Sequence, residues 1–292
     1  MRRIIMQVVG YVLYGLGVFA VLLYVMFPYD LLRQRLNEWL SQGAFQFDIA
    51  RLNSTFPPGL QVRQVRMRAK HQQIPESVLQ LDTLRVWPEW LALLSGSLQM
   101  HFAGTLYSGR VTGDIRYPSA AAATAWEGQI RLAALDMTQH PLLQQHGKMS
   151  VRGQLNGEAT ATVSQEGTLQ QGKVTFRLQP AVFTPGEDLQ LPLQREIPCD
   201  TLQGDLTLDP QQWQIETLTC QGNDVFIDVR GTLRPQRPFP NSALNLRLQL
   251  RSEEAFKQEI ALLGSFVRQR PDRRGEISFG LRGLLRQPRP VR

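Results

Sequence analysis

Residues 244–251 have the sequence Leu-Asn-Leu-Arg-Leu-Gln-Leu-Arg, so a leucine stands at every second position with a polar residue after it. This period of two is typical of a β-strand that buries one face and wets the other. The same alternation returns in shorter form at 98–102, 111–117, 174–178, 206–208, 213–215, 218–220 and 227–229. The pattern predicts a mainly β protein with about a dozen or more short strands, joined in a long, mostly antiparallel sheet.

Phase changes and repeated glycines indicate that this sheet is not flat. The alternation changes phase at Arg63–Gln64 and again between Leu81 and Leu84, as it does at β-bulges. The motif R-G-x-L also recurs, and glycine inside a strand marks a bend or bulge. Its three copies lie at 152–155, 230–233 and 282–285. Bends at the same place in successive strands would curl the sheet, although chance recurrence of common residues would also produce the motif.

A few short helices are expected among the strands. Capping residues and apolar spacing predict helices over 30–40 and 252–266, the second with Ser252 as its N-cap, and a helical turn over 87–94. Ser108–Gly109 is expected to turn the chain between two of the strands. The helices are too few to cover a long sheet.

The N-terminal segment is the one stretch long enough to cross a bilayer. Residues 4–29 carry no charge, and as a helix they span about 39 Å, more than the roughly 30 Å of a hydrocarbon core. Because Arg2 and Arg3 precede this segment, the positive-inside rule predicts a single-pass inner-membrane protein with its bulk in the periplasm. The alternative is a signal peptide cleaved after Val18-Phe19-Ala20, but apolar residues continue beyond that point.

These boundaries predict four parts. Residues 1–3 are cytoplasmic, residues 4–29 span the membrane, and residues 30–267 form a periplasmic β-rich domain, with two halves that could meet near 118–150. Residues 268–292 form a basic segment with a last strand. This segment holds eight arginines against Asp272 and Glu276, so most of the net charge of +7 lies there.

The composition offers little material for catalysis or for metal and cofactor binding. Two cysteines cannot form a four-cysteine zinc site, and none of the four histidines has a metal-ligand spacing. No phosphate-binding loop, dinucleotide fingerprint, nucleophile elbow or zincin motif occurs. We therefore expect no enzyme, no cofactor and no catalytic or metal-binding residues. Nucleic acid is not an expected partner, because the basic segment would lie across the membrane from it.

Cys199 and Cys220 are the one candidate covalent feature. They flank a segment with strand–turn–strand character, 206–215, and the periplasm is oxidising. Antiparallel strands can bring two such positions into bridging range. The spacing predicts a disulfide that stabilises by roughly 3 kcal/mol on the chain-entropy model; two separate buried thiols are the alternative.

The order of features resembles a known family. A basic N-terminus and an apolar segment ending in Phe27-Pro28-Tyr29-Asp30 precede a short helix, and Pro57-Pro58-Gly59-Leu60 then opens a strand. The element Leu81-Asp82-Thr83-Leu84-Arg85-Val86, the turn Leu91–Gly96 and the strand through Leu106–Val111 follow. This layout, over residues 1–117, resembles the protein N (GspN) family of bacterial type II secretion systems and, more broadly, the AsmA-like inner-membrane-anchored periplasmic proteins.

The resemblance implies an accessory, non-catalytic envelope protein whose partners are other type II secretion subunits. The broader AsmA-like family implies an alternative, lipid handling in outer-membrane homeostasis, since its members are thought to shield acyl chains in grooved sheets. This chain is much shorter than the large lipid-bridging members.

Alternation also predicts a candidate apolar groove. One strand would carry Leu98, Met100 and Phe102 on one side, and another Leu244, Leu246, Leu248 and Leu250. A single curled sheet would leave these faces as a trough for phospholipid acyl chains or a partner's strand, open or covered by the 252–266 helix. A closed sandwich would leave no cavity. A free edge strand could also pair with a partner strand.

Overall fold

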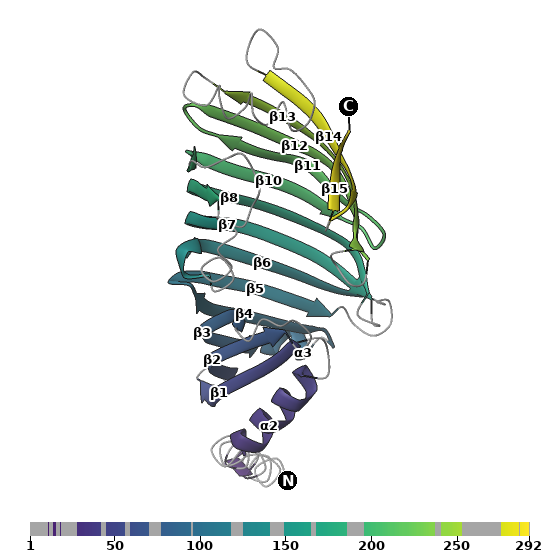
Figure 1. Ribbon diagram of the computed structural model, residues 1–292. Helices are drawn as coiled ribbons and strands as arrows, with labels where there is room; N and C mark the ends of the chain where they lie inside the picture. Colours follow the sequence, from purple (N-terminus) through teal and green to yellow (C-terminus); the bar gives the residue numbers. More distant parts are fainter. Residues whose placement is uncertain are drawn as a thin grey trace.

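The computed structural model describes residues 11, 14–15, 18, 28–41, 45–55, 59–69, 77–94, 96–117, 125–140, 149–164, 168–185, 196–236, 241–252, 276–285 and 287–291. Most of them belong to one antiparallel sheet of fifteen strands (Figure 1). The protein is therefore mainly β, as predicted, with few helices among the described residues.

The strands follow one another in chain order. The first eight are β1 (Phe45–Thr55), β2 (Gly59–Ala69), β3 (Ser77–Pro88), β4 (Leu98–Leu106), β5 (Gly109–Tyr117), β6 (Ala125–Asp136), β7 (Met149–Ser164) and β8 (Leu169–Pro185). The others are β9 (Ile197–Cys199), β10 (Thr201–Leu208), β11 (Trp213–Gln221), β12 (Val225–Arg234), β13 (Ala243–Ser252), β14 (Glu276–Leu284) and β15 (Gln287–Val291). The continuous helical elements within the described residues are α2 (Tyr29–Leu40), α3 (Trp90–Leu94) and the 3₁₀ turn η1 (Met137–Gln139).

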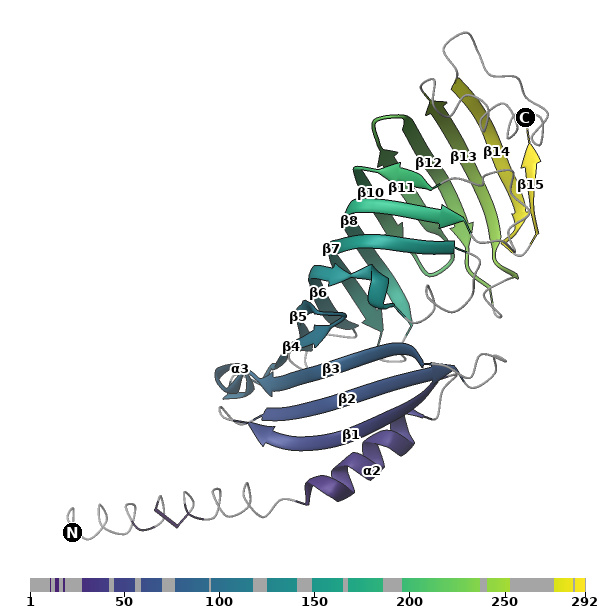
Figure 2. The same ribbon diagram turned by 60° about the vertical axis from the view of Figure 1, so that its left-hand side comes forward.

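Each strand pairs with its neighbours in the chain, apart from β9, which pairs only with the end of β8 while β10 pairs with the rest of that strand. β5 pairs with β6 and β6 with β7, so the two halves expected to meet near 118–150 share one continuous sheet. Figure 2 shows how the strand direction turns from β1 to β14 as the sheet twists and curls.

The three R-G-x-L motifs lie at bends in their strands. Gly153 in β7, Gly231 in β12 and Gly283 in β14 have φ values of 136°, 143° and 116°, which side-chain-bearing residues rarely adopt. The pairing of β7 with β8 also shifts register between Arg152 and Gln154. A Cβ at Gly153 or Gly231 would overlap a carbonyl oxygen of the neighbouring strand. The prediction of a curled sheet is confirmed, and glycine makes the bends possible.

The two predicted changes of phase in the apolar–polar alternation have different structural causes. Gln64 adopts φ 53° with no shift of the β1–β2 register, so the phase change there comes from a left-handed residue. Between Leu81 and Thr83 the register of β3 and β4 does shift, as a bulge requires.

The core consists of patches on one face of the sheet. Near β1, the buried residues Ile49, Leu52 and Val62 pack against Leu32 and Leu36 of α2. Two larger patches follow along the sheet, around Leu106 and Leu135 and around Leu178 and Ala181. A last patch contains Ile277 and Phe279. Among the described residues no second sheet covers this face.

Several local expectations need correction. The turn after β4 is Tyr107–Ser108, one residue earlier than predicted, and Gly109 opens β5. The basic C-terminal segment contributes two strands, β14 and β15, where one was expected. The helical turn predicted over 87–94 begins only at Trp90, because β3 continues to Pro88. The helix over 30–40 is present as α2.

Two expected helices cannot be judged. Apart from Tyr11, Tyr14, Gly15, Val18 and 28–29, the predicted span over 4–29 lies outside the described residues, as does the helix over 252–266 beyond Ser252. Of the helices that the structure describes, none has the length and apolar character needed to cross a membrane.

Candidate functional site: an apolar trough on the sheet

The apolar face of the sheet is hollowed over β4 to β7. The cavity has a volume of about 520 Å³ and its apolar wall residues are Phe102, Ile115, Trp126, Ile130 and Val163. Ile115 and Ile130 in this wall are 39% and 42% exposed. We refer to this cavity as the trough. Asp114, Glu127, Thr160 and Ser164 also line it, but most of its surface is apolar and suits an apolar ligand.

Small residues give the trough its depth. Gly128 of β6 and Ala159 and Ala161 of β7 lie among the larger wall residues. At one end the rings of Tyr117 and Trp126 pack together, with centroids 4.6 Å apart. Large side chains around a floor of small ones leave space that the sheet itself does not fill.

The pairing register places both predicted groove sets on this same face. Phe102 lies opposite Gly113, which lies opposite Ile130, and the same stepwise pairing continues to Leu246 opposite Gly231. The two sets are still far apart, because β4 and β13 are separated by eight steps of about 4.8 Å, roughly 40 Å along the sheet.

Only part of the predicted groove lines the trough. Phe102 does, whereas Leu244 is buried, and Leu248 and Leu250 pack against the patch of Ile277 and Phe279. The other apolar walls, Ile115, Trp126, Ile130 and Val163, were not among the residues predicted for the groove. Trp126 and Ile130 do alternate, but Gly128 between them weakened the signal.

The opposite face of the sheet is polar and carries charges of both signs. Arg131 lies 3.5 Å from Glu158, which also accepts a hydrogen bond from Gln129. On β12 the guanidinium of Arg230 donates to both carboxylate oxygens of Asp228, at 3.0 and 3.3 Å. These interactions join groups along and across the strands; the Arg131 and Glu158 side chains are exposed, whereas Asp228 is buried.

Helix α2 covers the outer edge of β1 with a row of polar side chains. The Arg33 guanidinium donates to the Ala50 carbonyl at 2.7 Å, and the Ile49 N–H donates to Asn37 Oδ1 at 3.1 Å. The Phe47 N–H donates to Ser41 Oγ at 3.0 Å. Arg33, Asn37 and Ser41 are four residues apart and therefore share one side of the helix. We call this set the edge ladder, because it bonds the backbone groups that another strand would use.

The other outer strand is protected by its sequence. β15 is Gln-Pro-Arg-Pro-Val, and it pairs with Gly280–Leu284 of β14. Pro288 and Pro290 stand at alternate positions whose N–H groups would point away from β14, so the outer side of β15 lacks those donors. Strand addition, which the sequence left open, is thus disfavoured at Phe47–Ala50 of β1 and along β15.

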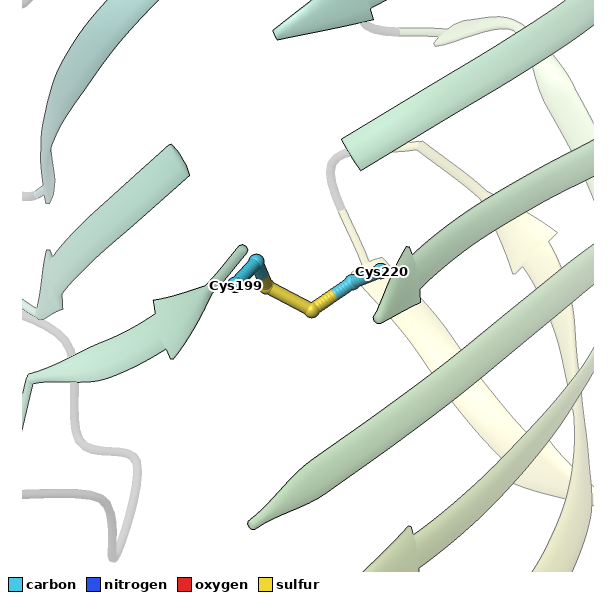
Figure 3. Close-up of a disulfide and its surroundings, with 2 residues drawn as sticks. All are labelled: Cys199 and Cys220. Atoms are coloured by element: carbon cyan, nitrogen blue, oxygen red, sulfur yellow. A yellow bond between two sulfur atoms is a disulfide. The ribbon is translucent and has the colours of Figure 1, made fainter. Parts of the chain in front are cut away.

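The predicted disulfide joins Cys199 and Cys220, with their Cα atoms 5.6 Å apart (Figure 3). Cys199 ends β9 and Cys220 lies in β11 opposite Leu202 of β10. Both cysteines are buried, in the patch that contains Leu178 and Ala181. The bridge therefore ties the short strand β9 to the main run of the sheet.

Among the described residues, the titratable groups whose pKa values are shifted lie near the turn after β4. The Tyr107 ring packs against His140, with centroids 5.2 Å apart. Burial raises the pKa of Tyr107 and lowers the pKa of His140. Hydrogen bonds from Thr138 lower the pKa of the nearby Asp136 carboxyl. Within the described ranges no three metal-binding side chains come together.

Comparison with known proteins gives no relative: no family model, no curated protein and no solved structure matches this chain. What the chain does has therefore to be inferred from the trough, the protected edges and the order of its sequence features.

Proposed function

We propose that this chain is a non-catalytic component of a type II secretion system, of the protein N kind. In this proposal residues 4–29 anchor it in the inner membrane, and the sheet lies in the periplasm. The trough then binds an apolar segment of another subunit of the machine. The order of features over residues 1–117 supports the family, and the open apolar face supports a binding role.

The observation that carries the proposal is the exposure of Ile115 and Ile130 on a face that is otherwise packed into patches. Exposed apolar surface of this kind marks binding sites. Since the edge ladder and the prolines of β15 disfavour strand addition, a partner would approach the face of the sheet.

Site-specific photo-crosslinking in the native bacterium tests this role. A photoreactive phenylalanine at Ile130 should form a crosslink to a subunit encoded beside the secretin and pseudopilins. The neighbouring Gln129 points to the polar face and is the matched control, which should give no such crosslink. Absence of any subunit crosslink at Ile130, together with normal secretion after deletion of the gene, would contradict the proposal.

Lipid handling is the second candidate, and the shape of the trough favours it. A cavity of about 520 Å³ with apolar walls, open to solvent, suits an acyl chain. Each buried methylene stabilises by about 0.8 kcal/mol. In this version the trough shields acyl chains during outer-membrane homeostasis.

A photoactivatable phospholipid separates the two candidates. If acyl chains occupy the trough, the probe should crosslink to residues 113–132, and Ile130→Arg should reduce that crosslink severalfold. Gln129→Arg adds the same charge on the other face and should leave it unchanged. Equal crosslinking of all three proteins would exclude a trough-bound acyl chain.

A further inference from the structure

Helix α3 exposes apolar side chains from a firmly held backbone. Of the side chains described in α3, Trp90, Leu91 and Leu93 are 50%, 76% and 40% exposed. The Glu89 N–H donates to the Gln99 carbonyl at 2.8 Å, and the Ser97 N–H donates to the Ala92 carbonyl at 3.0 Å. The first bond joins the start of this turn to β4, and the second closes the turn at its C-terminal end. A fixed backbone that presents apolar residues to water indicates an interaction surface.

α3 lies at the same end of strands β1–β3 as the first turn of α2. The edge ladder runs along β1 so that the first turn of α2 lies toward Thr55. Arg85 of β3 donates to Thr55 Oγ1 at 3.3 Å, which places the end of β3 near the end of β1. β3 ends at Pro88, and α3 follows at once (Figure 2). Only two strand spacings, roughly 10 Å across the sheet, separate β1 from β3 here.

We propose that α3 binds the surface of the bilayer, with Trp90, Leu91 and Leu93 in its interfacial layer. This inference rests on the proposed anchor, because an uncharged segment that ends at Tyr29 brings the bilayer surface to the start of α2. Tryptophan favours that layer, where its ring is buried and its N–H stays hydrated. A bilayer therefore fits the position of α3 and the chemistry of its side chains.

Contact of α3 with the membrane would restrict the orientation of the anchored sheet. A single span leaves the periplasmic sheet free to swivel about the chain that joins them. With α3 also at the membrane surface, two contacts on either side of β2 would fix the tilt of the sheet and the direction in which the trough faces.

Fluorescence quenching in nanodiscs tests the inference with the full-length protein. The chain's two cysteines are joined, so one introduced cysteine can be labelled selectively. An environment-sensitive dye would be placed at Leu91→Cys, at Val18→Cys within the proposed span, or at Ser108→Cys. Ser108 lies beyond the far end of β4, about 30 Å from α3, and is the matched control. Spin-labelled phosphatidylcholine in the nanodisc would serve as the quencher.

The expected result is quenching of the labels at Val18 and Leu91 by about twofold or more, with none at Ser108. Trp90→Ser with Leu93→Ser should reduce quenching at Leu91 and leave Val18 unchanged. Quenching at Val18 without quenching at Leu91 would contradict binding of α3 to the bilayer and would still support the membrane anchor. No quenching at Val18 would overturn the proposed anchor and, with it, this inference. An unquenched Leu91 label that responds to an added secretion subunit would assign α3 to a protein partner instead.

Discussion

A single added methyl group should be costly at Gly153 and Gly231. Both have φ values that L-residues rarely adopt, and a Cβ would overlap a carbonyl oxygen of the neighbouring strand. We expect Gly153→Ala or Gly231→Ala to lower the free energy of unfolding by about 2 kcal/mol or more. Urea denaturation of the purified variants measures this.

Gly128 provides the control for those substitutions. It lies in β6, where an added Cβ would meet nothing closer than the Asp114 carbonyl oxygen at 3.9 Å. Gly128→Ala should change stability by less than about 1 kcal/mol. Equal losses at all three glycines would show that the bends do not depend on the two positive-φ residues.

His140 should make stability depend on pH. Burial holds its pKa below the ordinary 6.5, so the unfolded chain takes up a proton before the folded one as pH falls. The contribution of His140 is fully present above about pH 6.5 and is lost as pH falls from there through the lower folded pKa. Replacement by phenylalanine should therefore reduce the difference between urea midpoints at pH 7.5 and 5.5. An unchanged difference would mean that the His140–Tyr107 contact is not linked to protonation.

Single residues also show where prediction from sequence fails. Ser108–Gly109 has the composition of a turn, yet the left-handed positions are Tyr107 and Ser108, at φ 48° and 60°. Gly109 is needed in the strand instead, because a Cβ there would lie 2.7 Å from the carbonyl oxygens of Ala133 and Ala134. Composition identifies the glycine, but it does not show whether the fold uses its tolerance of positive φ or its lack of a Cβ.

At the scale of elements, the edge ladder should protect β1 from exchange and from pairing. Replacing Arg33, Asn37 and Ser41 together by alanine removes side-chain partners of Phe47, Ile49 and Ala50. We expect faster hydrogen exchange at the Phe47 and Ile49 amides and concentration-dependent dimers, since an uncovered edge strand invites pairing. Hydrogen exchange and mass photometry in detergent would measure the two effects.

The exposed side of α2 supplies the matched control. Gln34, Arg35 and Glu38 face solvent, and their replacement by alanine removes three polar side chains from the same helix. This variant should exchange at the wild-type rate and stay monomeric. Dimers in both variants would implicate weakening of the helix and not loss of the ladder.

Helices and strands with a clear hydrophobic period could be predicted from the sequence. Those whose apolar positions hold small residues could not. The alternating leucines predicted β13, and the spacing of Leu32 and Leu36 predicted α2. β7 was largely missed because Gly157, Ala159 and Ala161 occupy its apolar face, so its period of two is nearly invisible in hydropathy. The edge ladder could not be foreseen, since its residues look like a solvated helix face until β1 is placed beside them.

For the whole molecule, we expect stability to be local. Strands contact mainly their neighbours in the sheet, so a local loss of stability should affect only the few strands around it. Reducing the disulfide should therefore raise hydrogen exchange in β8–β12, where it removes roughly 3 kcal/mol. Strands β1–β3 should keep their exchange rates. Uniform acceleration along the chain would show that the sheet unfolds as a single unit.

The overall architecture was more predictable than the site. Period-two alternation and the R-G-x-L bends give a curled antiparallel sheet, because both depend on local sequence. The trough depends on which residues of β4 to β7 the register sets side by side, and small errors of register or phase would place Ile130 on the wrong face. Only Phe102 among its walls was therefore identified.

The two protected outer strands have a consequence for how such molecules could work together. Because α2 at Phe47–Ala50 and the prolines of β15 disfavour strand addition, end-to-end joining of copies into one longer sheet is disfavoured, and the apolar face of each copy then ends with its own fifteen strands. A ligand bound to the apolar face of one molecule would then have to dissociate before it could bind to the next molecule. A row of these proteins would therefore pass such a ligand on in separate steps of dissociation and binding, and not along one continuous apolar surface.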